Sequence, residues 1–218
     1  MTFKEHILPY LRLNAGIIQQ HLFRGTSNPY EGAEVNVLQV VVTRGLQASC
    51  KSTWARLLAE HSWDYLDRNE CRWVRICKDD IRSMMGEYWV PSREEYINDC
   101  IKSMIYGALM EGYCVVFDGL GLKEETIRMI QEVCMDVARD RWLLKSVRCK
   151  VELFYKDFPS NIEYCIQRDE LGAKTGDRRR IGESVIRETA ETYKDVLAGL
   201  RSGAPYEVCN WSYYMDNN

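Results

Sequence analysis

One segment of the chain, residues 36–56, constrains the fold more than any other. An apolar run rich in β-branched residues is followed by a loop and then by a stretch compatible with a helix. This order encloses the pattern G-x-x-x-x-C-K-S, where a phosphate-binding loop would have G-x-x-x-x-G-K-[ST]. The sequence therefore predicts a nucleotide-binding loop, and its candidate binding residues are Gly45, Leu46, Gln47, Ala48, Ser49, Cys50, Lys51, Ser52 and Thr53.

The residue types of this loop suit the binding of a triphosphate. Successive backbone N–H groups, together with the N-terminus of the following helix, form a concavity for phosphate oxygens. We expect Lys51 to reach the β- and γ-phosphates and the Ser52 hydroxyl to coordinate Mg²⁺. The predicted cofactors are therefore ATP and Mg²⁺.

Cys50 departs from the pattern because it stands where glycine is usual. Glycine is favoured where the backbone approaches a ligand or takes a positive φ, and a Cβ there costs about 1–2 kcal/mol. Two other interpretations follow: the match is accidental and the turn binds nothing, or the loop binds nucleotide without turnover. The strand before the loop and the helix after it favour a functional loop.

Composition is that of an ordinary soluble globular protein. The 218 residues are 46% apolar and 28% charged with a formal net charge of −3, so a site for a polyanion has to be a local patch. Nine cysteines without a C-x-x-C pair and three scattered histidines disfavour a zinc site. Because no secretory or membrane-spanning segment is recognisable, we expect reduced thiols and a cytoplasmic location.

Strands and helices alternate along the predicted chain. This order indicates an α/β fold of the phosphate-loop type, with a parallel sheet of about five strands and helices on both faces. We expect residues 1–35 to be a helical extension and residues 36–218 the main domain. The predicted strands are 37–42, 71–77, 113–117, 147–155 and 206–209, and the predicted helices besides the one after the loop are 5–23, 91–112, 123–140, 160–168 and 183–200.

Two acidic residues follow predicted strands, at the edge where ligands bind in parallel sheets. Asp79 follows the second strand and Asp118 the third, and Arg82 lies one helical turn after Asp79. A carboxylate accepts the proton of an attacking hydroxyl and an arginine binds phosphate, so these residue types suit kinase chemistry. The alternative is that Asp79 or Asp80 caps a helix while Arg82 faces water.

An arginine-rich segment, residues 168–180, lies between two predicted helices. We predict a glycine-containing loop that closes over the nucleotide as a lid, because arginine binds phosphate in a bidentate manner. The alternative is a basic loop that only faces water. The cations of this segment are Arg168, Lys174, Arg178, Arg179 and Arg180.

A second basic stretch lies at residues 139–150 and includes Trp142. Cations beside an aromatic ring can follow a nucleic-acid backbone and stack a base. We favour the alternative, a helix end and a strand start whose cations face water. These cations are Arg139, Arg141, Lys145, Arg148 and Lys150.

Taken together, the motifs resemble the bacteriophage polynucleotide 5′-kinase family of P-loop kinases. The resemblance rests on residues 43–45 and 51–55, on Lys-Asp-Asp-Ile-Arg at 78–82 and on Val-Val-Phe-Asp at 115–118. It covers residues 36–196 and implies a P-loop kinase fold with an arginine-rich lid. The chain departs from the family at 119–121, where Gly-Leu-Gly replaces the usual polar residues.

The resemblance also implies a role for each matching residue. Lys51 and Ser52 would hold ATP and Mg²⁺, and Asp79 would be the general base. Arg82 would bind a phosphate of the acceptor, and Arg178 or a neighbour would be the catalytic arginine of the lid. The further candidates for substrate binding are Asp118, Arg168 and Arg179.

We therefore expect an ATP-dependent kinase that phosphorylates a hydroxyl of a nucleic acid, most simply a 5′-OH end of DNA or RNA. One alternative is a kinase of a hydroxymethylated base in DNA, of a nucleoside or of another small molecule. Another is a catalytically impaired protein that binds nucleotide or nucleic acid, for which Cys50 is the main argument.

Overall fold

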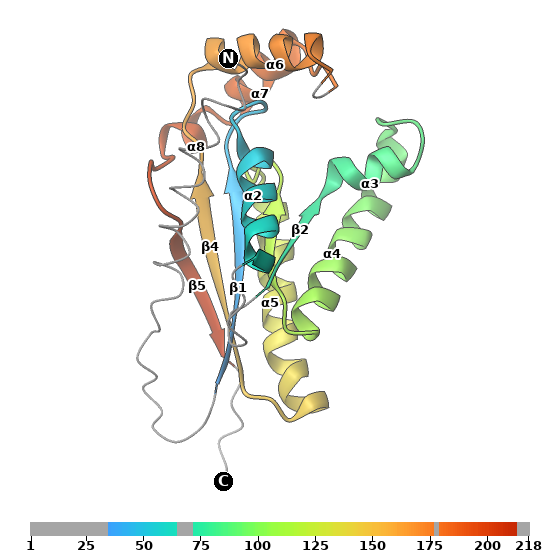
Figure 1. Ribbon diagram of the computed structural model, residues 1–218, viewed down its shortest axis with the longest axis vertical. Coiled ribbons are helices and arrows are strands. Elements are labelled where there is room, and N and C mark those ends of the chain that lie inside the picture. The colour runs from blue at the N-terminus through green and yellow to red at the C-terminus, as the bar shows by residue number, and fades with distance from the viewer. Residues whose placement is uncertain (1–34, 65–71, 177–178, 213–218) are drawn as a thin grey trace.

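The computed structural model describes residues 35–64, 72–176 and 179–212. A central sheet lies between helices, and the helices α6 and α7 cover one end of it (Figure 1). The strands are β1 (Asn36–Arg44), β2 (Trp73–Cys77), β3 (Cys114–Asp118), β4 (Cys149–Asp157) and β5 (Tyr206–Ser212). The helices are α2 (Lys51–Asp64), α3 (Lys78–Met84), the short 3₁₀ helix η1 (Pro91–Arg93), α4 (Glu94–Met110), α5 (Glu124–Lys145), α6 (Ile162–Lys174), α7 (Glu183–Thr192) and α8 (Lys194–Ala198).

Five strands form the sheet in the order β2-β3-β1-β4-β5. The first four are parallel, which confirms the predicted sheet, whereas β5 runs antiparallel to β4 at the edge. The parallel strands end at the same edge of the sheet, so Arg44, Cys77 and Asp118 lie at neighbouring strand ends. The phosphate loop and α3 therefore begin at the same edge of the sheet, with the end of β3 between them.

The buried residues of β1 alternate between two helical layers. Val40 and Val42 belong to a core with the buried residues of α4 and α5, while Val41 packs with α2. This is the period of two that a strand covered on both faces requires. The layers hold β1 rigidly in the centre of the sheet, and the phosphate loop leaves from its end.

An ion pair joins the strand ends beside the loop. Arg44 donates to both oxygens of buried Asp157, over 2.7 and 2.8 Å, and the hydroxyl of Tyr206 donates to the same carboxylate over 2.9 Å. Arg44 and Asp157 are also register partners in β1 and β4. The start of the phosphate loop is thereby fixed to β4 and β5.

The lid segment differs from the prediction. Arg168 and Lys174 lie in α6 rather than in a loop, because the helix continues to Lys174. Gly172 does not end it, since a single glycine costs a helix only about 1 kcal/mol. The chain leaves the helix near Gly176, whose φ is 72°. The connection is therefore shorter than predicted, and Arg178 lies outside the described residues.

Other helix boundaries also differ from the prediction. The predicted helix at 183–200 is divided at Tyr193, whose φ of −114° and ψ of 24° leave the helical region, into α7 and α8. The predicted extension at 1–35 lies outside the described residues except for residue 35 and stays a prediction. In the described part of the chain, no helix is both long and apolar enough to cross a membrane.

One cysteine does not follow the prediction of reduced thiols. Cys114, buried at the start of β3, is disulfide-bonded, so the prediction is wrong for this residue. Composition cannot reveal such a bond because it does not say which sulfur atoms meet in the fold. The described cysteines with free thiols are Cys50, Cys77, Cys100, Cys134, Cys149, Cys165 and Cys209.

Candidate active site

The phosphate loop joins the end of β1 to the first residue of α2. Its φ angles are positive at Gly45 (148°), Ala48 (58°) and Cys50 (75°). Left-handed backbone at alternate residues is the conformation of an anion-binding nest, in which neighbouring N–H groups converge. Gly45 has no room for a side chain, because a Cβ there would lie 2.7 Å from the carbonyl oxygen of Phe158.

Lys51 is folded into the interior of this loop. The residue is only 6% exposed, and its ammonium group donates to the carbonyl oxygen of Leu46 and, over 3.3 Å, to the hydroxyl of Ser49. A lysine held among loop oxygens is positioned to exchange them for phosphate oxygens. The structure thus places the ammonium group of Lys51 inside the phosphate loop, and its contact with phosphates stays a prediction.

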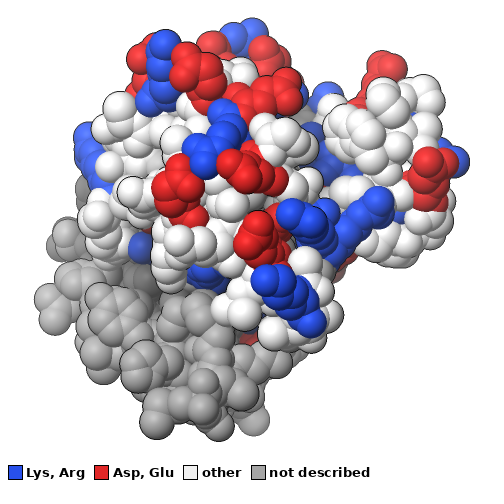
Figure 2. All heavy atoms as spheres, turned by 90° about the horizontal axis from the view of Figure 1, so that it is seen from above, with Lys and Arg blue, Asp and Glu red and all other residues white. Residues whose placement is uncertain are grey.

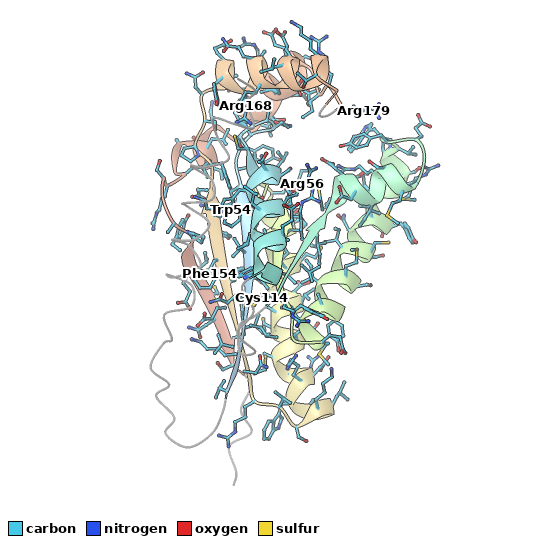
Figure 3. The ribbon with its side chains drawn as sticks, in the orientation of Figure 1. Trp54, Arg56, Cys114, Phe154, Arg168 and Arg179 are labelled. Carbon is cyan, nitrogen blue, oxygen red and sulfur yellow. The ribbon has the colours of Figure 1, made fainter. Side chains whose placement is uncertain are left out.

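Cys50 is contacted from the lid. A guanidinium nitrogen of Arg168 lies against its sulfur, and Arg168 also packs 5.4 Å from the ring centroid of Tyr164. In Figure 3, Arg168 reaches from α6 toward the loop at the end of β1. Arg168 therefore connects the lid to the phosphate loop, at a residue whose positive φ would suit glycine better.

A series of side-chain contacts connects the loop to α3. Ser52 donates to Asp118 Oδ1 over 3.0 Å, and Arg75 Nε donates to Asp118 Oδ2 over 2.7 Å. A second nitrogen of Arg75 donates to Asp80 Oδ2 over 2.5 Å. Burial lowers the pKa of Arg75, but the neighbouring Asp118 outweighs this effect and raises it, so the arginine stays charged. We call these four residues the Ser52–Asp80 bridge.

Arg75 was not among the residues predicted for the site. It lies in the middle of β2, in the run Trp-Val-Arg-Ile-Cys, and its side chain is 13% exposed. An arginine inside a short apolar strand was the available signal, because burying a guanidinium requires a carboxylate partner.

Ser52 and Asp118 offer oxygen ligands that suit Mg²⁺. The ion prefers oxygen and is often held by one or two carboxylates together with substrate phosphates. The Asp118 residue is 2% exposed, and its carboxylate lies within hydrogen-bond distance of the Ser52 hydroxyl. Over residues 35–64, 72–176 and 179–212, no group of three or more His, Cys, Asp or Glu side chains is arranged for a metal. These residues fit an ion that enters with a nucleotide.

Asp79 and Arg82 lie together on α3, as predicted. Arg82 Nη1 donates to Asp79 Oδ1 over 2.6 Å, and the other side of the guanidinium donates to both oxygens of Glu94 over 2.8 and 2.6 Å. The hydrogen bond from Arg82 lowers the pKa of Glu94, which keeps this pair ionised. The side chain of Asp79 is 58% exposed and that of Arg82 is 14% exposed, so the carboxylate is open to a substrate.

Tyr88 is a third member of this group. Burial and a hydrogen bond to Asp79 raise the pKa of Tyr88 to about 12, so the phenol stays protonated and donates to the carboxylate. Arg179 from the lid lies 4.7 Å from the centroid of the Tyr88 ring. Figure 3 places Arg179 at the tip of the lid, on the side of α3. The lid therefore meets the Asp79 group through Tyr88.

The glycines at 119 and 121 have a packing role. A Cβ on Gly121, whose φ is 61°, would lie 2.2 Å from the carbonyl oxygen of Thr43. The Thr43 hydroxyl donates to the carbonyl oxygen of Gly119 over 3.0 Å. The amide of Gly45 donates to the carbonyl oxygen of Leu120, also over 3.0 Å. The Gly-Leu-Gly segment thus packs closely against the start of the phosphate loop.

The basic stretch at 139–150 contacts its own fold. Arg141 is 5% exposed and donates to the carbonyl oxygens of Leu109 and Met110 at the end of α4. Lys145 donates to Met110 and Glu111, and Arg139, Lys150 and their carboxylate neighbours form ion pairs. The prediction that its cations face water is therefore wrong for Arg141, which stabilises a helix end.

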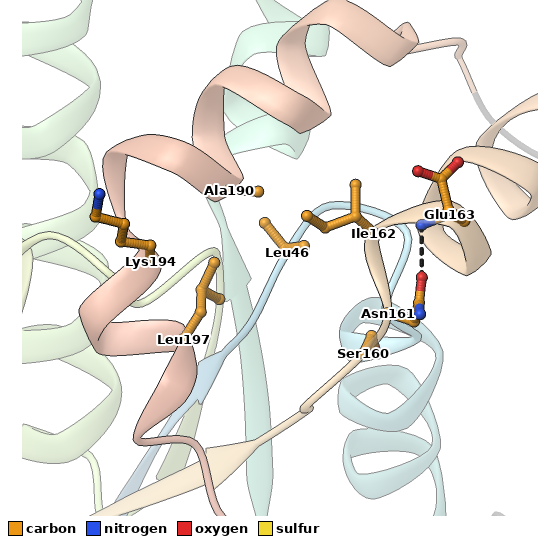
Figure 4. Close-up of a pocket in the computed structure, with 8 residues that line it drawn as sticks. All are labelled: Leu46, Ser160, Asn161, Ile162, Glu163, Ala190, Lys194 and Leu197. Carbon is orange, nitrogen blue, oxygen red and sulfur yellow. Dashed lines mark hydrogen bonds between the residues drawn. The ribbon is translucent and has the colours of Figure 1, made fainter.

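A pocket of about 520 Å³ lies beside the phosphate loop, between the start of α6 and the helices α7 and α8 (Figure 4). Its wall combines apolar side chains with polar groups at the rim, which suits a planar heterocycle with a polar edge. The lining residues are Leu46, Ser160, Asn161, Ile162, Glu163, Ala190, Lys194 and Leu197.

Comparison with solved structures agrees with the fold. A chain of the Pnkp1/Rnl/Hen1 RNA repair complex matches with a TM-score of 0.56 and 18% identity, over 84% of this chain and 51% of that chain. This chain thus spans about half of that chain's length. The Mycobacterium tuberculosis APS kinase CysC matches with a TM-score of 0.44 and 15% identity, over 65% of this chain and 76% of that chain. A gluconokinase from Sinorhizobium meliloti 1021 matches with a TM-score of 0.43 and 16% identity, over 79% of this chain and 83% of that chain.

No curated protein matches the chain by sequence. A protein-family comparison matches residues 40–198, which contain the phosphate loop, the Asp79 group and the lid, to a family described as AAA domain. The fold is that of the P-loop kinases. Because the match covers most of the sequence, the chain belongs to this AAA domain family.

Proposed function

We propose that this chain is an ATP- and Mg²⁺-dependent kinase that phosphorylates a hydroxyl of a nucleic acid, most simply a 5′-OH end. The observation that carries the proposal is the Ser52–Asp80 bridge. It ties the first turn of α3 to the phosphate loop through Asp118 and Arg75. A proton acceptor on α3 is thereby held beside the nucleotide side of the sheet.

In the proposed reaction, Asp79 accepts the proton of the acceptor hydroxyl. The hydroxyl oxygen forms a bond to the γ-phosphorus as the bond from that phosphorus to the β–γ bridging oxygen breaks, and ADP leaves. Lys51 neutralises charge on the β- and γ-phosphates. Ser52 and Asp118 would hold Mg²⁺, which would supply further neutralisation of these oxygens.

We assign some arginines of the site to the phosphate acceptor and others to the ATP donor. Arg82, beside Asp79, binds a phosphate of the acceptor. Arg168, which already touches the phosphate loop, is positioned to contact the donor phosphates. Arg179 of the lid segment lies against Tyr88. Arg179, or Arg178 before it in the sequence, supplies positive charge between donor and acceptor.

The pocket beside the phosphate loop is the proposed site of the nucleotide base. It adjoins the loop through Leu46, and Asn161 at its rim caps α6 by accepting from the amide of Glu163 over 2.8 Å. With the base bound in this pocket, the phosphates of the nucleotide would lie in the phosphate loop.

A second candidate function is favoured by Cys50. Its positive φ and its contact with Arg168 indicate a loop in which a side chain occupies space that glycine leaves open. In that case the chain would bind nucleotide or nucleic acid without transferring phosphate.

Transfer of label from γ-labelled ATP to a panel of acceptors tests the proposal. The panel contains 5′-OH DNA, 5′-OH RNA, a duplex with hydroxymethylated bases, and free nucleosides. We expect label on the 5′-OH ends, and its loss with EDTA. Label only on the hydroxymethylated duplex would show that the acceptor is a modified base, and label only on nucleosides would show that it is a small molecule. ATP binding by calorimetry without any transfer would support the second candidate function.

A further inference from the structure

An exposed aromatic side chain lies next to the Asp79 group. Trp89 is 56% exposed, and the guanidinium carbon of Arg82 lies 5.1 Å from the centroid of its ring. An exposed indole beside a cation offers an aromatic face on which a nucleic-acid base can stack. Tyr88 before it is partly buried against Asp79, whereas Trp89 presents its ring to solvent.

A second side chain faces this region from α2. Arg56 is exposed and follows Ser52 by one helical turn. Figure 3 shows it on the side of α2 that faces β2 and α3. Among the described residues it has no hydrogen-bond or ion-pair partner, unlike Arg75 and Arg82. A cation without a carboxylate beside it is available to an anionic ligand.

The lobe that bears α3 and Trp89 stands apart from the rest of the molecule (Figure 2). In Figure 2, the lobe on the right that bears α3 is mostly uncharged, and a hollow separates it from the main body. Glu87 and Glu95, which flank Trp89 in the sequence, are exposed. A base can stack on the indole only when it is not already stacked within a duplex, so the ring suits an unpaired nucleotide.

We infer that Trp89 and Arg56 form a subsite for the unpaired terminal nucleotide of a polynucleotide acceptor. The indole stacks on the terminal base, and Arg82 holds the phosphate on the 3′ side of that nucleotide, so that Asp79 meets the 5′ hydroxyl. Arg56 binds the next phosphate along the strand. The inference rests on the proposed function, which it sharpens: the acceptor is an unpaired end, recognised over one or two nucleotides.

Steady-state kinetics with three acceptors tests the inference. These are a single-stranded 5′-OH oligonucleotide, the same strand in a blunt duplex, and a nucleoside without phosphate. For the single strand we expect Trp89→Ala to raise KM about 10-fold with little change in kcat, and Trp89→Phe to restore most of the loss. Arg56→Ala should raise the same KM about 10-fold and lower the slope of log KM against log salt by about one. It should leave the KM for the nucleoside unchanged.

Matched surface variants serve as controls. Tyr96 is 60% exposed on α4, and the side chain of Arg128 is 64% exposed on α5. Tyr96→Ala and Arg128→Ala remove an aromatic ring and a guanidinium outside the proposed subsite, so both should keep the KM of the unmodified chain. Thermal unfolding of all variants confirms that they fold.

Binding of a fluorescent single strand, measured by anisotropy without ATP, separates the two proposals. If Trp89→Ala changes neither Kd nor KM while 5′ ends are phosphorylated, the subsite is wrong and the kinase proposal stands. Equal KM values for single strand and blunt duplex would also overturn the subsite. If Kd rises about 10-fold in Trp89→Ala but no acceptor is phosphorylated, the subsite stands and the proposed reaction fails. If no polynucleotide binds or is phosphorylated, both fail.

Discussion

The two halves of the candidate site are built in different ways. The nucleotide half is a loop between β1 and α2 in which Ser49 and Lys51 are buried and positive φ angles shape the backbone. The acceptor half is α3, a helix of seven residues with none buried. It is held by ion pairs, from Arg75 to Asp80 and from Arg82 to Glu94.

This difference separates what the fold fixes from what it leaves open. A loop shaped by backbone conformation and packed between core layers binds the part of the substrate that all ATP-dependent kinases share. A surface helix held by side-chain pairs can change its residues without disturbing the core. Under the proposed function, the acceptor specificity would lie in α3 and the residues after it, and we expect that each half can be disabled separately.

The largest effect is expected from Lys51→Ala, which removes the ammonium group inside the loop. Both ATP affinity and transfer should be lost, with transfer reduced by at least about 10³-fold, because the charge on the β- and γ-phosphates is no longer neutralised. Calorimetry with ATP and label transfer measure the two effects. Lys102→Ala, at an exposed position of α4, is the control and should change neither. Preserved ATP binding in Lys51→Ala would end the phosphate-loop interpretation.

Asp79→Asn should disable the acceptor half alone. The amide keeps the size of the side chain but cannot accept the proton, so transfer should fall at least about 10²-fold while ATP affinity stays the same. Single-turnover transfer and ATP calorimetry check both parts. Asp99→Asn, exposed on α4, provides the matched control. A near-normal rate in Asp79→Asn would remove this residue from the role of general base.

Arg75→Lys tests the connection between the halves. Lysine keeps the positive charge but lacks the planar guanidinium, whose separate nitrogens donate to Asp118 and to Asp80. We expect kcat to fall about 10-fold with ATP affinity unchanged, because Asp79 loses its fixed position relative to the phosphates.

The control for Arg75→Lys is Arg139→Lys, since Arg139 also spans two carboxylates, Asp136 and Asp140, but on the outer surface of α5. Its kcat should not change. Equal, small effects of the two substitutions would show that the Ser52–Asp80 bridge does not position the acceptor half.

Much of this arrangement was predictable because its signals are local. The run before Gly45 predicts a buried strand, the loop motif predicts its turn, and Asp79 and Arg82 share one turn of a helix at any tertiary arrangement. The parallel order of β1 to β4 follows from alternation of strands and helices. The sequence therefore predicted most of the nucleotide half and the Asp79–Arg82 pair.

The remainder depends on contacts between distant segments. Arg75 and Asp118 lie 43 residues apart and meet only because β2 and β3 are neighbours in a register that pairs Cys77 with Asp118. The end of α6 was missed because the cost of Gly172 is small beside the packing of Cys165 and Ile166 against Leu46. No pattern within one segment specifies which side of α2 faces α3, so Arg56 was also missed.

Cys50→Gly should have the smallest effect, and it tests whether the cysteine side chain obstructs the phosphate loop. Glycine takes a φ of 75° without strain, a gain of about 1–2 kcal/mol that its greater freedom in the unfolded chain partly offsets. We expect the free energy of unfolding in urea to rise by about 1 kcal/mol and turnover to change less than about 3-fold. Cys50→Ala keeps the Cβ and its strain, so it should show no such gain in stability. A rise in turnover of tenfold or more in Cys50→Gly alone would mean that the Cβ obstructs the phosphate site, and would favour an impaired protein over a kinase.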